Sequence, residues 1–179
     1  MTMMLDRPLL TVPISDRDHT IGPETAALTL VEYGDYECPY CGMAHPAVKE
    51  VLRVMGDDVR FAYRHFPMAQ IHPHAYGAAL AAEAAAAQSA FWPMHEVLFE
   101  NQDRLAIPDL VTYAQALGLD VDRFVLDLEQ RTYEPKVRED FMSGVRSGVN
   151  GTPTFFINGV RHNGGYDAPS LLAALRAEL

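Results

Sequence analysis

The two cysteines of this chain, Cys38 and Cys41, lie where a predicted strand is followed by a predicted helix. Residues 27–34 (ALTLVEYG) combine β-branched, apolar and aromatic side chains over the length of one strand. From Pro39 onward the apolar residues recur at helical spacings of three and four, at Val48, Val51, Leu52 and Met55. Proline suits a first helical turn because its missing N–H would have no partner there. The sequence therefore predicts a strand and a helix joined at a CxxC pair, with Cys38 at the helix N-terminus.

A long stretch without strand pattern follows this first unit. From residue 74 to about residue 149 the chain is rich in Ala, Leu and Glu, and prolines and capping residues divide it into predicted helices. Asn158-Gly159 is a dipeptide typical of a tight hairpin turn, so we expect two strands to meet there. The elements predicted outside the helical stretch are strands at residues 58–67, 153–159 and 160–166 and an amphipathic helix at residues 168–179.

The predicted order is strand, helix, strand, a block of helices, a hairpin and a last helix. A CxxC pair within a βαβ pattern is typical of the thioredoxin-like fold. We therefore expect an α/β protein with a thioredoxin-like fold and an all-helical insertion between the βαβ half and the C-terminal ββα half. With 179 residues, 49% of them hydrophobic, the chain can bury one sizeable core. We expect an N-terminal extension at residues 1–18 and a single domain at residues 19–179, with the insertion at about 72–148.

Charge and hydropathy exclude several classes of function. The formal net charge of −10 is not the electrostatic footprint of a protein that binds nucleic acid or an anionic membrane surface. The chain has no run of about 18 apolar residues, so we expect no membrane insertion. The first twenty residues include Asp6, Arg7 and two prolines and lack the apolar run of a signal peptide. We expect a cytoplasmic monomer, and a periplasmic protein only if a signal peptide has been trimmed.

A pair of cysteines in a protein can be a structural disulfide, part of a metal site or a redox-active pair. Two cysteines are too few for the disulfide framework of a small secreted domain. A zinc site usually needs four ligands, and the chain has no second CxxC and only His72 and His74 close together among seven histidines. A redox-active pair is favoured, because the N–H groups and dipole at a helix N-terminus stabilise a thiolate at Cys38. The alternative is a redox-inert protein that binds Cu or Zn through the cysteines on the same fold.

Five motifs indicate a family: LVEYGDYECPYC, RHFP, AAEAAAAQSAFWPMHEVLFENQ, ALGLDVDRF and GVNGTPTFFING. With them, nearly the whole chain from His19 onward resembles the DsbA-like thiol–disulfide oxidoreductases. The resemblance is closest to a bacterial subgroup that also occurs as a soluble domain fused to sodium/proton antiporters. It implies that Cys38 is the nucleophile, Cys41 the resolving cysteine and Pro153 a cis proline beside the active site. The chain departs from the family prototype, which has a secretory signal and a histidine between its cysteines.

The two residues between the cysteines, Pro39 and Tyr40, bear on the redox potential. Tyr40 offers a hydroxyl and an aromatic face where the strongly oxidising family member has a histidine. Glu32, Asp35 and Glu37 precede Cys38 and would oppose thiolate formation if they lay close to it. The CPYC sequence resembles that of glutaredoxins, whose reduction potentials are about −200 to −230 mV. We therefore expect a reduction potential between those of thioredoxin and DsbA.

Glu32 is the remaining candidate for a catalytic role. An ordinary glutamate in an alternating strand would face solvent. However, Glu32 stands six residues before Cys38, as does the buried carboxylate that it resembles in thioredoxin-like enzymes. In that position it would accept the proton of Cys41 during resolution.

These observations predict a thiol–disulfide oxidoreductase that needs no metal and no organic cofactor. Its partners would be protein or peptide thiols and disulfides, and glutathione. Cys38, Cys41 and Glu32 would be catalytic, and the substrate would bind at Pro39, Tyr40, Thr152 and Pro153. A glutathione-dependent transferase or isomerase is disfavoured, because such enzymes usually lack a CxxC pair.

Overall fold

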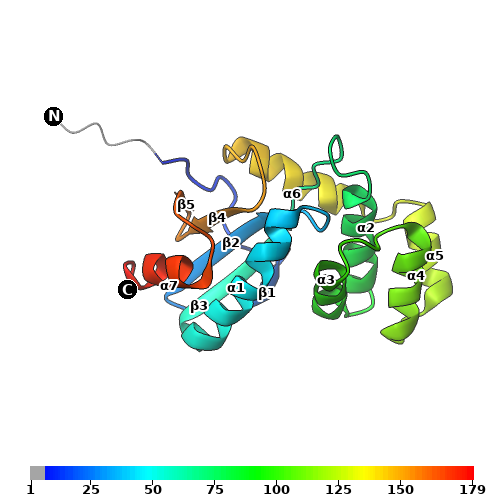
Figure 1. Ribbon diagram of the computed structural model, residues 1–179, viewed down its shortest axis with the longest axis horizontal. Helices are drawn as coiled ribbons and strands as arrows, with labels where there is room; N and C mark the ends of the chain where they lie inside the picture. Colours follow the sequence, from blue (N-terminus) through cyan, green and yellow to red (C-terminus); the bar gives the residue numbers. More distant parts are fainter. Residues whose placement is uncertain (1–6) are drawn as a thin grey trace.

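The computed structural model describes residues 7–179, so the first six residues of the predicted N-terminal extension lie outside the described part. Five strands form one sheet in the order β1-β3-β2-β4-β5 (Figure 1). The strands are β1 (His19–Ile21), β2 (Leu28–Gly34), β3 (Val59–His65), β4 (Thr154–Ile157) and β5 (Val160–His162). β2 and β3 are parallel, and the other neighbouring pairs are antiparallel.

Seven α-helices and one short 3₁₀ helix make up the rest of the regular structure within residues 7–179. Their bounds are α1 (Pro39–Met55), η1 (Gly56–Asp58), α2 (Ala75–Ala86), α3 (Phe91–Glu100), α4 (Ile107–Ala116), α5 (Val121–Glu129), α6 (Glu134–Arg146) and α7 (Ala168–Arg176). The helices α2 to α6 follow one another without an intervening strand, and α2, α4 and α5 lie on the opposite side of α3 from α1 and α7 (Figure 1). No helix within residues 7–179 is both long enough and apolar enough to cross a membrane. The predicted fold class, an α/β thioredoxin-like fold with a helical insertion, is confirmed.

Each face of the sheet is covered by its own set of elements. Successive side chains of a strand point to opposite faces, so the central strand β2 is buried on both sides. Leu28 and Leu30 belong to a core cluster shared with buried residues of α1, α3 and α7. Val31 and Tyr33 belong to a second cluster on the other face, where Phe141 of α6 also packs. Glu32 shares the face of Leu28 and Leu30, which places it beneath α1.

The structure adds a strand that the sequence pattern did not indicate. β1 has only three residues, too few to display an alternation of apolar and polar side chains. It exists because its backbone pairs with β3, where His19 lies opposite Tyr63.

The described part of the predicted extension also runs beside the sheet. The Leu10 N–H donates to the Gly159 carbonyl at 2.8 Å, and the Arg161 N–H donates to the Pro8 carbonyl at 3.0 Å. Buried Arg64 pairs with Asp18, with 2.8 Å between Nε and Oδ1.

Candidate active site

The two cysteines lie at the N-terminal end of α1, just beyond the end of β2. Cys38 immediately precedes the helix and has an extended backbone, with φ −71° and ψ 122°. Its N–H donates to the Asp35 carbonyl at 3.2 Å, and its carbonyl accepts from the Gly42 N–H at 3.1 Å. Cys38 is 3% exposed and Cys41 is fully buried. Both thiols are free, and Cys38 is the one nearer to solvent.

The surroundings shift the pKa values of the two thiols in opposite directions. The pKa of Cys38 is lowered to about 5, first by a hydrogen bond from the Cys41 thiol and also by the backbone N–H groups of Cys41 and Tyr40, against the opposing effect of burial. Burial raises the pKa of Cys41 well above its usual value, and the hydrogen bond to Cys38 acts in the same direction. N–H groups at a helix N-terminus stabilise a thiolate in this way. At neutral pH, Cys38 is therefore a thiolate and Cys41 a thiol.

The loop before β4 brings Thr152 and Pro153 against Cys38. The Thr152–Pro153 peptide bond is cis. When it is protonated, the Cys38 thiol donates to the Thr152 carbonyl, with 3.5 Å between sulfur and oxygen. These residues are 114 positions apart in the chain, and sheet pairing brings them together. Tyr33 of β2 lies opposite Thr154 of β4, so the end of one strand and the start of the other meet at the cysteine.

Glu32 is buried below the cysteine pair. It is 2% exposed, and its Oε1 has no hydrogen-bond partner among the described residues. Burial raises its pKa to about 8, and the negative charge of Cys38 adds to the shift. Glu32 is in turn one of the groups that raise the pKa of Cys41. A carboxyl group with a pKa near neutrality can both accept and return a proton.

The other two carboxylates of this segment are directed elsewhere. The Asp35 carboxylate accepts from the Glu37 N–H at 2.8 Å and the Met68 N–H at 2.9 Å, and it lies 2.8 Å from His72 Nδ1. Glu37 Oε1 lies 2.9 Å from His74 Nδ1. Hydrogen bonds thus hold both carboxylates, which would oppose thiolate formation if they lay close to Cys38, toward the loop after β3. The pKa of Cys38 remains low.

The remaining predicted substrate-binding residues surround Cys38 at the surface. Pro39 and Tyr40 are both exposed, and 59% of Tyr40 is open to solvent. Met43, one turn further along α1, is 66% exposed. Thr152 and Pro153 are partly exposed. The structure thus gathers the four predicted residues around the sulfur that lies nearer to solvent.

Gln102 is a residue of this site that the sequence did not single out. It follows α3, and its side-chain Nε2 donates to the Tyr36 carbonyl at 2.9 Å and to the Cys38 carbonyl at 2.8 Å. Its only sequence signal is its place at the end of the motif FWPMHEVLFENQ. From the sequence alone, a glutamine in that position is indistinguishable from an ordinary polar residue that follows a helix.

Polar groups are also buried between the sheet and the insertion. The Tyr36 hydroxyl lies 2.9 Å from His95 Nδ1. Glu83 Oε1 lies 2.8 Å from the Nε2 atoms of both His19 and His65, which holds the pKa of Glu83 well below its usual value even though burial opposes the shift. These contacts connect α2 and α3 to β1, β3 and the loop before α1.

Within the described part of the chain, one group of three residues has ligand atoms close enough together for a metal ion. His65, Glu83 and Asp140 have such atoms within 4.8 Å of one another. Lys136 Nζ donates to the Asp140 carboxylate at 2.6 Å, which places a positive charge where a cation would have to bind. Among residues 7–179, no third His, Cys, Asp or Glu has a ligand atom within 4.8 Å of both cysteine sulfurs.

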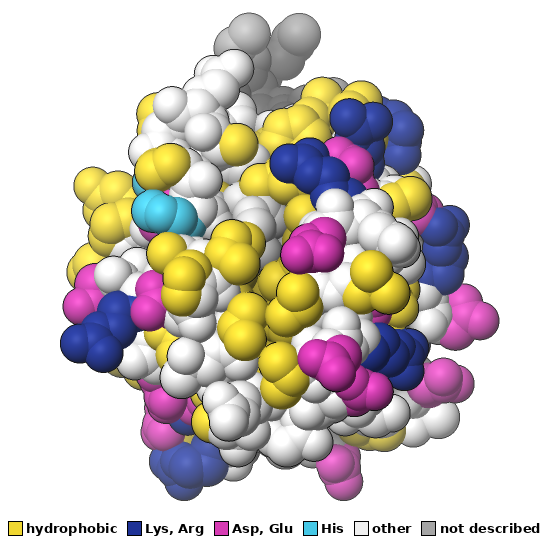
Figure 2. All heavy atoms as spheres, turned by 90° about the vertical axis from the view of Figure 1, so that its right-hand side faces the viewer, with side chains coloured by type: hydrophobic (Ala, Val, Ile, Leu, Met, Phe, Trp, Pro, Cys, Tyr) yellow, Lys and Arg dark blue, Asp and Glu magenta, His cyan; other side chains and the backbone are white. Residues whose placement is uncertain are grey.

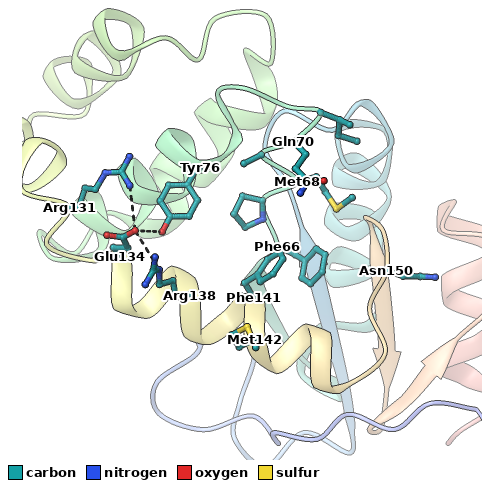
Figure 3. A pocket seen from close by; sticks show the side chains of 13 residues that line it. Phe66, Met68, Gln70, Tyr76, Arg131, Glu134, Arg138, Phe141, Met142 and Asn150 are labelled. Atoms are coloured by element: carbon teal, nitrogen blue, oxygen red, sulfur yellow. Dashed lines mark hydrogen bonds and ion pairs between the residues drawn. The ribbon is translucent and has the colours of Figure 1, made fainter.

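A groove of about 950 Å³ lies between the loop after β3 and helix α6 (Figure 3). Its apolar lining includes Phe66, Pro67, Met68, Ile71, Phe141 and Met142. Glu134 at one end accepts from the Tyr76 hydroxyl at 2.8 Å and pairs with Arg131 and Arg138 (Figure 3). Asn150 also lines the groove and belongs to the loop that contains Thr152.

Figure 2 shows the face that carries α4 and α5, with apolar side chains gathered near its middle.

Comparisons with known proteins agree with this fold. The sequence profile of the family described as Thioredoxin matches residues 15–177. The Na(+)/H(+) antiporter NhaA 3 of Salinispora tropica is 50% identical over 167 residues, which are 93% of this chain and 26% of the antiporter. The chain thus spans about a quarter of the length of that relative.

Two solved structures have the same architecture. BdbD from Bacillus subtilis superposes with a TM-score of 0.85 at 22% identity, covering 97% of this chain and 98% of BdbD. A thioredoxin-like oxidoreductase from Silicibacter pomeroyi gives a TM-score of 0.78 at 24% identity, covering 92% of this chain and 91% of that one. Since the family profile covers nearly all of the described residues, the chain belongs to the thioredoxin family, and its fold is that of the DsbA-like proteins.

Proposed function

We propose that this chain is a thiol–disulfide oxidoreductase that exchanges disulfides with protein or peptide thiols, and with glutathione, through Cys38 and Cys41. The observation that carries the proposal is the difference in acidity between the two thiols. Cys38 has a pKa lowered to about 5 and is the sulfur nearer to solvent, whereas buried Cys41 has a raised pKa. A structural pair of cysteines needs no such difference, while an attacking and a resolving thiol do.

In the first step, the Cys38 thiolate attacks one sulfur of a client disulfide. The Cys38–client bond forms, the client S–S bond breaks, and the second client sulfur leaves as a thiolate. In the second step, Cys41 loses its proton and its thiolate attacks the Cys38 sulfur. The Cys38–Cys41 disulfide forms, the Cys38–client bond breaks, and the client, reduced by two electrons, leaves with two thiolates that take up protons to give a dithiol. In reverse, the oxidised pair accepts two electrons from a client dithiol.

Glu32 is the group that accepts the Cys41 proton in this scheme. Burial opposes the ionisation of Cys41, so resolution requires a nearby base. Glu32 is buried, has a free Oε1 and a pKa of about 8, and influences the pKa of Cys41. Its proton returns when the reaction runs backward.

Pro39, Tyr40, Thr152 and Pro153 would hold the client. Tyr40 offers an exposed aromatic face beside Cys38, which suits an apolar residue near the client cysteine. The Thr152 carbonyl lies 3.5 Å from the Cys38 sulfur. A client joined to Cys38 would therefore run alongside the Thr152 backbone, as an extended peptide does when it pairs with an exposed segment.

Metal binding by the cysteine pair is the competing proposal. The ligand geometry favours exchange, because Cu or Zn sites use further ligands near the two thiolates. No such ligand lies within 4.8 Å of both sulfurs among residues 7–179. Equilibrium metal analysis after exposure to Cu(I) or Zn²⁺ and removal of the free ion separates the two. Near-stoichiometric retention of metal without disulfide exchange would favour the metal-binding protein.

Cys41→Ser provides the direct test of exchange. This variant keeps the attacking thiolate but cannot resolve, so it should accumulate a mixed disulfide with a model peptide disulfide. Cys38→Ser is the matched control, because it keeps the buried thiol and removes the attacking one. If Cys41→Ser forms no adduct, or Cys38→Ser forms as much, the proposal is wrong. A cytoplasmic location and a monomeric state also stay predictions, which cell fractionation and sedimentation would test.

A further inference from the structure

We propose that Gln102 is a positioning residue that sets the thiolate reactivity of Cys38. The inference rests on the proposed function, because it concerns the attacking group of that reaction. Gln102 belongs to the segment between α3 and α4, which the exchange mechanism does not otherwise use. Its side chain nevertheless reaches the loop that carries the nucleophile.

One amide group holds two carbonyls of the active-site loop. Gln102 Nε2 donates to the Tyr36 carbonyl at 2.9 Å and to the Cys38 carbonyl at 2.8 Å. These carbonyls stand on either side of Glu37, at the turn from β2 into α1. Both protons of the Gln102 amide are therefore used, and the loop is fixed at two points from outside the helix.

Gly42 makes room for this contact. A Cβ atom at position 42 would lie 2.1 Å from Gln102 Oε1 and 2.7 Å from its Cδ, far closer than atoms pack. The Gly42 N–H also donates to the Cys38 carbonyl, at 3.1 Å. The same carbonyl thus accepts from the first helical turn and from Gln102, so the orientation of the Cys38 peptide group is determined from two sides.

The hydrogen bonds of Gln102 influence the acidity of the Cys38 thiol through the backbone. The N–H groups of Tyr40 and Cys41 contribute to the low pKa of Cys38, and they point at the sulfur only while the first turn keeps its orientation. In addition, the amide protons of Gln102 partly neutralise the negative end of the Cys38 carbonyl, the carbonyl of the same residue that carries the thiolate. Both effects favour the thiolate, although Gln102 does not contact the sulfur.

Gln102→Met tests the inference, because it keeps the length of the side chain and removes the donors. The pH midpoint of thiolate formation by Cys38, followed by ultraviolet absorbance of the reduced protein, should rise by about half to one unit. The reduction potential should become about 15–30 mV more negative, which corresponds to a roughly threefold to tenfold change in the equilibrium constant. Gln102→Glu should raise the midpoint further, because a carboxylate replaces the donors with negative charge.

Gln88→Met is the matched control. Gln88 lies between α2 and α3, and its side-chain amide also bonds to backbone, at the Asp120 carbonyl (3.1 Å) and N–H (2.8 Å), away from the cysteine loop. In Gln88→Met, the pH midpoint of Cys38 thiolate formation and the reduction potential should equal those of the wild type. An unchanged midpoint in folded Gln102→Met, or an equal shift in Gln88→Met, would overturn the inference.

A second variant keeps the test decisive if Gln102→Met does not fold. Gln102→Asn retains the amide but shortens the side chain, so it cannot reach both carbonyls and should give a smaller rise in the same direction. An unchanged midpoint in that variant would also count against the inference. Failure of the proposed function is a separate result, because the thiolate midpoint is read on reduced protein without a client. A wild type that exchanges no disulfides would refute the function and leave the effect of Gln102 measurable.

Discussion

Replacing Glu32 with glutamine should change both the pH dependence of stability and the rate of resolution. The substitution keeps the shape of the side chain and removes its ability to ionise. Glu32 is 2% exposed, and burial raises its pKa from 4.5 to about 8. A charge at this position is therefore costly, so the carboxyl group is mostly protonated at neutral pH, and its ionised fraction, which grows as the pH rises toward 8, is the form that can accept the Cys41 proton.

The sign of the stability effect follows from that raised pKa. The contribution of Glu32 to the free energy of unfolding is fully present below pH 4.5 and is lost as the pH rises to about 8. A rise in the pKa of Glu32 from 4.5 to about 8 corresponds to a loss of at most about 5 kcal/mol from the free energy of unfolding. Glu32→Gln has no such loss, so its stability relative to the wild type should increase between pH 4.5 and 8 and level off above. Urea unfolding of reduced wild type and variant at several pH values measures the difference.

The kinetic effect should be confined to the second step of exchange. Without a base beside Cys41, the mixed disulfide should persist longer, while the first attack by Cys38 stays unchanged or becomes slightly faster because one negative charge is gone. Stopped-flow and quenched reactions with a model peptide disulfide separate the two steps. An unaltered resolution rate across pH 6 to 8, together with a stability difference that does not vary with pH, would refute the role of Glu32.

Three further outcomes are expected. In the reduced protein at neutral pH, Cys38 should alkylate far faster than Cys41, with a midpoint near pH 5; equal rates would contradict the assigned roles. The couple should equilibrate with glutathione between about −150 and −260 mV, and a value near −120 mV would show that Tyr40 does not make this site less oxidising than DsbA. Gly144→Ala should lower the free energy of unfolding by about 1–3 kcal/mol, because its Cβ would lie 2.8 Å from the Phe66 ring; calorimetry showing no loss would contradict this packing.

The sequence alone was sufficient for features that depend on neighbouring residues. Alternation and helical spacing predicted β2, α1, β3 and the helical block, and Asn158-Gly159 predicted the β4–β5 hairpin. These patterns are local, because a strand repeats every two residues and a helix every 3.6. The CxxC pair at a helix N-terminus also indicated which cysteine would be the more acidic.

Only the tertiary structure decided how distant residues act on the cysteine pair. Glu32 lies beneath α1 because sheet and helix bury it; its spacing from Cys38 suggested this only through the family resemblance, since the strand pattern alone also fits a glutamate that faces water. Asp35 is held by His72 and the Met68 N–H, so its carboxylate is directed toward the loop after β3, which its place three residues before Cys38 did not show. Gln102 acts on a peptide group 64 residues away, through contacts that exist only when the insertion packs on the active-site loop. Burial and hydrogen bonding between distant segments arise from packing, which local periodicity does not contain.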